Sequence, residues 1–179
     1  MITTTQLFLT PNEWSRPQRP IRDVRAIVLH WVQNPGTSAR ANRDFFEMRK
    51  DGRHGYGSAH FIADDTEIVA CIPIGEMAYH VGASEYTDFA RMYLGPYPNS
   101  YTIGIEMCHP TDTGEPTPVV WEKTVELTSE LLLAHALRPH HITTHHNITQ
   151  KYCPAWFVDH PAELDRFRWD VASHMRTAV

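Results

Sequence analysis

The sequence predicts an α/β fold, with a single domain in which a mixed central β-sheet is flanked by helices. Short apolar, β-branched runs alternate with stretches in which apolar residues recur at helical spacing, but no clean βαβ repeat occurs. The length of 179 residues fits one domain of ordinary size. With 42% hydrophobic and 21% charged residues, the composition is globular, which argues against a disordered or coiled-coil chain. Residues 1–23 are rich in proline and are expected to form an irregular lead-in, so that the domain proper spans residues 24–176.

The individual elements follow from local patterns. Residues 24–31 (VRAIVLHW) predict a buried strand, and a helix is expected from a cap at Thr37 or Ser38 to about Lys50, where Gly52 can stop it. Residues 82–100 contain clustered glycine and proline and predict a long loop. Three further strands are expected over residues 59–63, 67–73 and 101–108, the first two forming a hairpin, and two further helices over 119–137 and about 161–175.

Composition excludes several classes of protein. The formal net charge of −5 disfavours nucleic-acid binding. No apolar run approaches the roughly 18 residues of a membrane helix, so no membrane insertion is expected. No signal-peptide apolar region is visible either, which predicts synthesis in the cytoplasm. Three cysteines do not make a disulfide framework. The unusual number is 12 histidines, because imidazole is the commonest metal ligand.

The histidines concentrate in residues 139–154 (PHHITTHHNITQKYCP). His145 and Cys153 lie eight positions apart and could bind one ion, with His30, at the end of a predicted central strand, as a third ligand. The same residues also have interpretations that involve no metal. His30 could be a core imidazole, Cys153 an inert buried thiol, and His140 and His141 surface residues. Spacing alone leaves both interpretations open.

Five motifs in order carry a family likeness: AIVLHW (26–31), SAHFIADDTEIVACIP (58–73), MAYHVG (77–82), YTIGIE (101–106) and THHNITQKYCP (144–154). With these motifs the sequence resembles the zinc-dependent N-acetylmuramoyl-L-alanine amidases. This amidase-2 group includes phage endolysins, bacterial autolysins and the peptidoglycan recognition proteins. The likeness is greatest to the catalytic domains of phage endolysins, and it extends from about residue 24 to residue 160.

The resemblance implies site residues position by position. It implies that one catalytic Zn²⁺ is bound by His30, His145 and Cys153, with the cysteine acting as ligand and not as nucleophile. It places a general base at Glu106 and an oxyanion-stabilising cation at Lys151. In the remaining motifs, His80 is a candidate for substrate contact, His60 and His146 are expected to be structural or supporting, and His54 and His109 to lie on the surface. The chain departs from the family pattern at four positions that are not ligands: Val32, Ala59, Asn147 and Ala155.

The implied reaction is hydrolysis of the amide that joins N-acetylmuramic acid to L-alanine in peptidoglycan, by a monomer that acts on the cell wall after holin-dependent release. Bound zinc suits this reaction because it polarises a carbonyl and acidifies water. One rival is a non-catalytic peptidoglycan-binding module, which commonly lacks the ligand cysteine. The other is a cysteine peptidase with Cys153 as nucleophile; the following proline and the lack of a predicted helix start argue against it. The sequence leaves open whether the role is phage lysis, sporulation or wall turnover.

Overall fold

The computed structural model describes residues 2–177 and contains one mixed sheet of six strands in the order β1-β4-β3-β5-β2-β6. The strands are β1 (Thr5–Gln6), β2 (Ala26–Trp31), β3 (Phe61–Ala63), β4 (Ile68–Ala70), β5 (Thr102–Met107) and β6 (Ile142–Thr144). Neighbouring strands are parallel except for the β3–β4 hairpin, which is antiparallel. The prediction of a single α/β domain with a mixed central sheet is confirmed.

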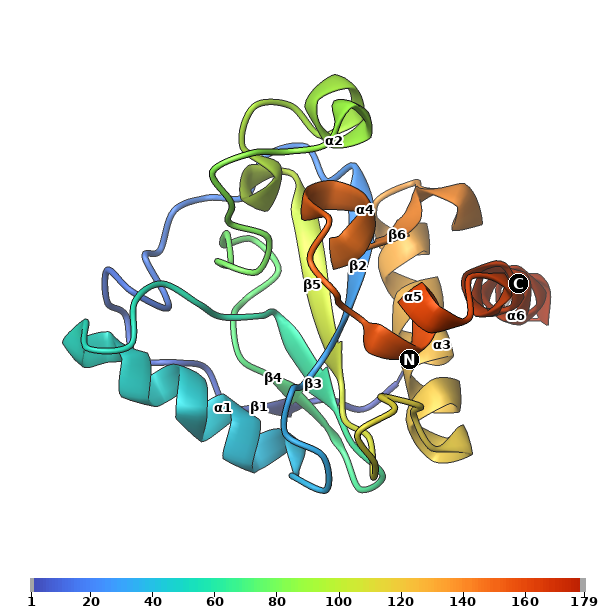
Figure 1. Cartoon of the computed structure of the whole chain (residues 1–179), viewed down its shortest axis with the longest axis horizontal. Helices are drawn as coiled ribbons and strands as arrows, with labels where there is room; N and C mark the ends of the chain where they lie inside the picture. The colour runs from blue at the N-terminus through green and yellow to red at the C-terminus, as the bar shows by residue number, and fades with distance from the viewer. Residues whose placement is uncertain (1, 178–179) are drawn as a thin grey trace.

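Helices cover both faces of this sheet (Figure 1). They are α1 (Ala39–Met48), α2 (Asp88–Tyr93), α3 (Pro118–Ala134), α4 (His145–Thr149), α5 (Ala155–Asp159) and α6 (Ala162–Thr177), with short 3₁₀ turns at Arg49–Asp51, Pro98–Ser100 and Pro139–His141. None of the helices in residues 2–177 combines the length and apolar character needed to span a bilayer. Figure 1 shows α1 and α6 at opposite ends of the molecule.

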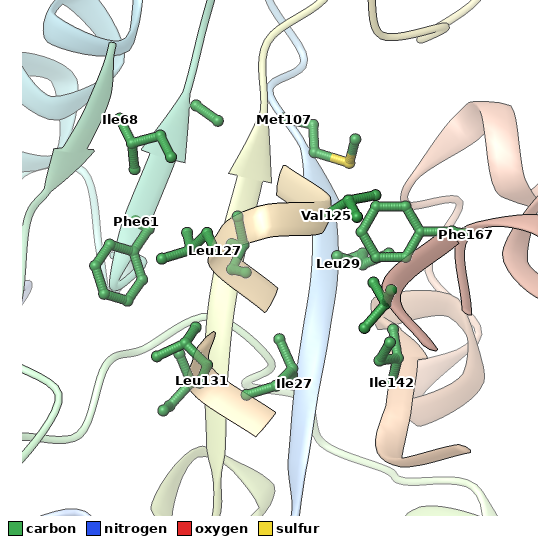
Figure 2. Packing of buried hydrophobic residues seen from close by; sticks show 14 of the residues in the cluster. Ile27, Leu29, Phe61, Ile68, Met107, Val125, Leu127, Leu131, Ile142 and Phe167 are labelled. Atoms are coloured by element: carbon green, nitrogen blue, oxygen red, sulfur yellow. The ribbon is translucent and has the colours of Figure 1, made fainter. Parts of the chain in front are cut away.

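The main core fills the face between the sheet and the α3–α6 pair. Alternate residues of β2 and β5 point to this face because side chains alternate along a strand. Figure 2 shows Ile27 and Leu29 of β2 meeting Leu127 and Leu131 of α3, with Phe167 of α6 beside them. All five are at most 5% exposed, so this face is sealed from solvent and leaves the opposite face for a site.

Two apolar clusters cover the two sides of the opposite face. Near β3 and β4, α1 packs through Ala39 against Ile62 and Val69. Near β2, α2 and α4 pack through Ala90 and Ile148. The carboxyl-terminal halves of β2 and β5 lie between these two clusters, and their open face borders the pocket described below.

Local signals explain the elements that the sequence predicted correctly. The hydroxyl of Ser38 accepts the N–H of Ala41 and caps α1, and Gly52 ends the following turn with a φ of 79°. In the β3–β4 hairpin, which lacks the favoured glycine, the Asp64 carboxylate accepts the backbone N–H groups of Thr66 and Glu67, both at 2.8 Å. These bonds form an Asx turn, which fixes the hairpin without a left-handed residue.

The structure differs from the sequence prediction in three regions. The segment 82–100, predicted as a loop, contains α2, because Thr87 caps it and Ala90 is buried beneath it. The histidine-rich stretch contains β6 and α4, which the sequence did not predict, and α5 follows it directly. Within residues 1–23, which were expected to be irregular, Thr5 and Gln6 pair with β4 as an added edge strand.

Candidate metal centre

Three side chains from distant parts of the chain meet at the open face of the sheet. His30 is the second-to-last residue of β2, His145 is the first residue of α4, and Cys153 lies two residues before α5 begins. The His30 Nδ1 atom lies 3.1 Å from Nδ1 of His145 and 3.7 Å from Sγ of Cys153. All three side chains are buried, and their ligand atoms lie within 4.8 Å of one another. The structure thus brings together the three residues predicted as metal ligands.

These distances can be compared with a tetrahedral zinc site. Zn–N bonds of about 2.0 Å and Zn–S bonds of about 2.3 Å place two nitrogens about 3.3 Å apart and a nitrogen and a sulfur about 3.5 Å apart. The two separations that include His30, 3.1 Å and 3.7 Å, are close to these values, and the ligand atoms of His145 and Cys153 lie within 4.8 Å of each other. Two imidazoles and one sulfur are also a donor set that zinc prefers, with a fourth position left over. The residues present therefore fit a zinc ion.

Electrostatics favour the same assignment. Burial lowers the pKa of His145 to about 3, with help from the charge of Lys151, and burial lowers the pKa of His30 well below its ordinary value. Both imidazoles are therefore neutral at pH 7 and can donate a lone pair. Burial raises the pKa of the Cys153 thiol to about 12. A thiolate at this position needs an adjacent cation, which a bound metal supplies.

A chain of hydrogen bonds sets which nitrogen of His30 faces the other ligands. The hydroxyl of Thr102 donates to the carbonyl oxygen of Pro98 at 2.9 Å, so it accepts from Nε2 of His80 at 3.0 Å. Nδ1 of His80 then accepts from Nε2 of His30, 2.9 Å away. The Nδ1 lone pair of His30 is thereby left for a metal, with the ring held in place.

These hydrogen bonds change the interpretation of His80. The side chain borders the pocket, as expected for a substrate contact, but it is buried and both of its ring nitrogens are engaged by His30 and Thr102. Neither nitrogen is left for a substrate. The geometry instead shows His80 holding the ring of His30, one of the three candidate ligands.

Glu106 lies beside His30 because the two residues are register partners on the parallel strands β5 and β2. Register partners project from the same face of a sheet. The Oε2 atom of Glu106 is enclosed and has no hydrogen-bond partner among residues 2–177. Burial raises the pKa of this carboxyl to about 8, against the attraction of Lys151. An unpartnered carboxyl oxygen at the edge of a pocket is suited to exchange a proton with a bound molecule.

The other predicted residues occupy varied positions. Lys151 is exposed and lines the same pocket, as an oxyanion-stabilising cation would. His60 is buried and structural, with Nδ1 accepting the N–H of Gly104 and Nε2 contacting the carbonyl of Glu76. The expectation that His109 lies on the surface is wrong: it is buried and stacks on Trp31, and its ring nitrogens contact the backbone carbonyl oxygens of Val32 and Thr111.

The three candidate ligands border one pocket of about 830 Å³, together with His80, Glu106 and Lys151. Its walls include residues that sequence reasoning missed, mainly the aromatic and basic residues Arg19, Phe45, Arg49, Tyr56, Tyr79 and Tyr97. They come from the lead-in, from α1 and the 3₁₀ turn that follows it, and from three loops. No spacing pattern connects these segments, so only the folded structure could group them.

A single site with two imidazoles, one sulfur and a neighbouring carboxylate is typical of mononuclear zinc hydrolases. A family model described as N-acetylmuramoyl-L-alanine amidase (Amidase_2) matches residues 20–156. The chain therefore belongs to the amidase-2 family, and the resemblance seen in the sequence motifs is confirmed.

Individual relatives agree with this assignment. The chain is 31% identical over 177 residues to a probable N-acetylmuramoyl-L-alanine amidase of Bacillus licheniformis, covering 97% of this chain and 48% of the relative. It is 32% identical over 182 residues to N-acetylmuramoyl-L-alanine amidase BlyA of Bacillus subtilis (strain 168), covering 98% and 48%. The chain thus spans about half the length of the curated relatives it matches.

Solved structures share the fold. The catalytic domain of XlyA superposes with a TM-score of 0.75 at 24% identity, covering 95% of this chain and 99% of that domain. PlyL superposes with a TM-score of 0.77 at 18% identity, covering 95% and 97%. At these identities the likeness supports the fold alone, and the chemistry is argued from the site.

Proposed function

We propose that this protein hydrolyses the amide bond between N-acetylmuramic acid and the L-alanine of the peptidoglycan stem peptide, with one zinc ion as cofactor. The observation that carries the proposal is the buried group of His30, His145 and Cys153 beside the unpartnered carboxyl of Glu106 in one open pocket. The family membership and the names of the curated relatives support the choice of substrate.

The side chains have separate tasks in this reaction. When zinc is bound by the three ligands, it polarises the scissile carbonyl and makes water more acidic. Glu106 accepts the proton of the attacking water at its carboxyl oxygen and returns it to the leaving nitrogen of alanine. Burial raises the pKa of Glu106 to about 8, against the charge of Lys151, so this carboxyl can take up and release a proton near neutral pH. Lys151 donates to the carbonyl oxygen as negative charge develops there.

The two rival functions differ in what they require of Cys153. A non-catalytic binding module has no need for a complete ligand set, whereas this chain brings all three donors together. For a cysteine peptidase, the helix α5 does begin two residues after Cys153, contrary to the expectation from sequence. However, the sulfur is buried and the contacting imidazoles are neutral, so no imidazolium stabilises a free thiolate. These observations favour the metal-dependent hydrolase.

Mass spectrometry of digested cell walls tests the proposed cleavage directly. The zinc-loaded protein is expected to release peptides that begin with a free alanine amine and to leave glycan strands intact. Glu106→Gln, which keeps the size of the side chain, is expected to retain zinc and to lose at least about a hundredfold in rate. Release of disaccharide fragments, or of peptides cut within the stem, would refute the assigned bond. Full activity of zinc-free protein would refute the assigned cofactor.

A further inference from the structure

The pocket has the opposite charge balance to the molecule as a whole. The chain carries a formal net charge of −5, yet the charged residues that line the pocket are Arg19, Arg49 and Lys151 against the single carboxylate Glu106. Lys151 lies two residues before Cys153, whereas Arg49 lines the pocket from a distant part of the chain, directly after α1. An electropositive pocket on an acidic protein selects for an anionic ligand.

Arg49 is held rigidly at this wall. Its Nη1 atom donates to the carbonyl oxygens of His54, Gly55 and Tyr56, and its guanidinium lies 4.8 Å from the centroid of the Phe45 ring. Gly57 makes room for it, since a Cβ at that position would lie 3.0 Å from the Arg49 Cζ atom. The guanidinium is therefore fixed in orientation before any ligand arrives.

Arg49 nevertheless lacks a counter-ion. Its neighbours along α1 and the next loop are each paired with a carboxylate: Arg40 with Glu67, Arg43 with Glu47, and Arg53 with Asp51. Within residues 2–177, Arg49 forms no ion pair, and its Nε is enclosed without an acceptor. Its Nη2 atom makes no hydrogen bond to any residue in the described part of the chain. A half-buried cation without an anion is costly unless a ligand supplies the partner.

We infer that Arg49 binds a free carboxylate of the stem peptide and thereby makes the enzyme prefer acidic over amidated peptides. The inference rests on the proposed function and names the carboxylate of the substrate that the pocket would bind. A guanidinium donates charge-assisted N–H···O bonds to a carboxylate, which are stronger than those it donates to the uncharged oxygen of a carboxamide. The neighbouring Arg19 adds positive charge at the same wall, close to the ring pair of Tyr56 and Tyr79.

Two pairs of synthetic muramyl peptides test this inference. In the first pair, the residue after alanine carries either a free α-carboxylate or a carboxamide; in the second pair, the carboxyl terminus of the peptide is free or amidated. We expect the zinc-loaded wild type to prefer the acid in one pair by roughly tenfold to a hundredfold in kcat/KM. Arg49→Gln should abolish that preference, because the acidic peptide then loses the cation that distinguishes it from the amidated peptide. The pair that responds identifies which carboxylate is bound.

Arg53→Gln is the matched control, because Arg53 is exposed, lies in the same segment, is paired with Asp51 and does not line the pocket. It should keep the wild-type preference. Arg49→Lys keeps the charge without the planar fork and should show a reduced preference. The ratio of rates on two peptides does not depend on the fraction of folded protein, so partial unfolding of a variant does not obscure the result.

Calorimetric titration of zinc-free protein with the released peptides gives a second readout that needs no turnover. The wild type should bind the acidic peptide more tightly than the amidated one, and Arg49→Gln should bind both equally. The inference is overturned if the wild type cleaves both members of each pair equally, or if Arg49→Gln keeps the full preference. Failure of the wild type to cleave any of the four peptides, all of which contain the muramyl–alanine amide, would instead count against the proposed function.

Discussion

Gly104 is the residue that allows β5 to pass close to His80. A Cβ added to Gly104 would lie 2.6 Å from Nδ1 of His80, the same atom that contacts His30. No real side chain tolerates such an approach, so either the strand or the imidazole would have to move. The requirement for glycine here is one of space and not of backbone conformation.

Gly104→Ala should therefore destabilise the fold by about 1–3 kcal/mol and weaken zinc binding as well, because the displaced His80 no longer orients His30. Gly75→Ala is the control, since a Cβ there meets no atom within 4 Å, and it should change stability by less than about 0.5 kcal/mol. Urea unfolding and chelator competition measure the two effects. Equal behaviour of both variants would contradict the close contact.

His80 itself should affect zinc binding without being a ligand. His80→Ala is expected to lower zinc affinity about 10–100-fold, the usual effect of removing a group that orients a ligand histidine. His80→Gln, whose amide oxygen can accept from His30, should recover part of the loss. His146→Ala is the control, because the hydrogen bonds of His146 use only its backbone. Wild-type zinc affinity in both His80 variants would disprove the orienting role.

At the scale of elements, Glu47 ties α1 to the amino-terminal segment. Its carboxylate accepts the backbone N–H of Thr10 at 3.0 Å and pairs with Arg43 at 3.1 Å and Lys50 at 2.9 Å. Burial alone would raise the pKa of Glu47, but the hydrogen bonds from Thr10 and Lys50 and the charge of Arg43 lower it to about 2. A carboxylate with a lowered pKa stabilises the folded state when it is ionised.

The sign of the pH dependence follows from this shift. The ordinary glutamate pKa of about 4.3 applies to the unfolded chain. The contribution of Glu47 is complete above that pH and is lost as the pH falls toward 2. Glu47→Gln should therefore lower the Tm at pH 7, and the gap to wild type should narrow below about pH 4.5. Glu85→Gln, at an exposed residue, is the control. A gap that stays constant from pH 7 to pH 2.5 would contradict the assignment.

The elements that the sequence predicted are long enough to show a hydrophobic period or a capping residue. The 17-residue helix α3 and the hydrophobic strands β2 and β5 belong to this group. The elements it missed are β6, α4 and α5, of three to five residues, and α2 of six. Such short segments complete too few turns for a period to appear. They form through tertiary contacts, such as the 2.7 Å bond from the Thr87 hydroxyl to the Asn147 carbonyl.

At the scale of the whole molecule, the site is assembled from segments far apart in the chain. His30 and Cys153 are separated by 123 positions, so their meeting depends on the parallel pairing of β2 with β5 and β6. The resemblance in the motifs predicted the three candidate ligands and Glu106, and the fold places these four residues together. Neither the orienting contact of His80 nor the unpaired charge of Arg49 could be predicted, because both depend on distances between loops.

Because the ligands lie in separate elements, zinc should stabilise the whole fold. A ligand that binds only the folded state adds about 4 kcal/mol at a concentration 1,000 times its Kd. Addition of zinc to the chelated protein is therefore expected to raise the Tm by several degrees, and Cys153→Ser should show a much smaller rise. The Tm measured across a zinc titration tests this coupling. Equal increases in both proteins would show that the sulfur is not a ligand.

X-ray absorption spectroscopy at the zinc edge tests the proposed ligand set most directly. We predict one sulfur at about 2.3 Å and two imidazole nitrogens at about 2.0 Å, with a lighter fourth ligand. The sulfur shell should disappear in Cys153→Ser, and the imidazole signal should fall in His145→Ala. A wild-type spectrum with only nitrogen and oxygen neighbours, or one unchanged in both variants, would contradict the metal centre on which the proposed hydrolysis depends.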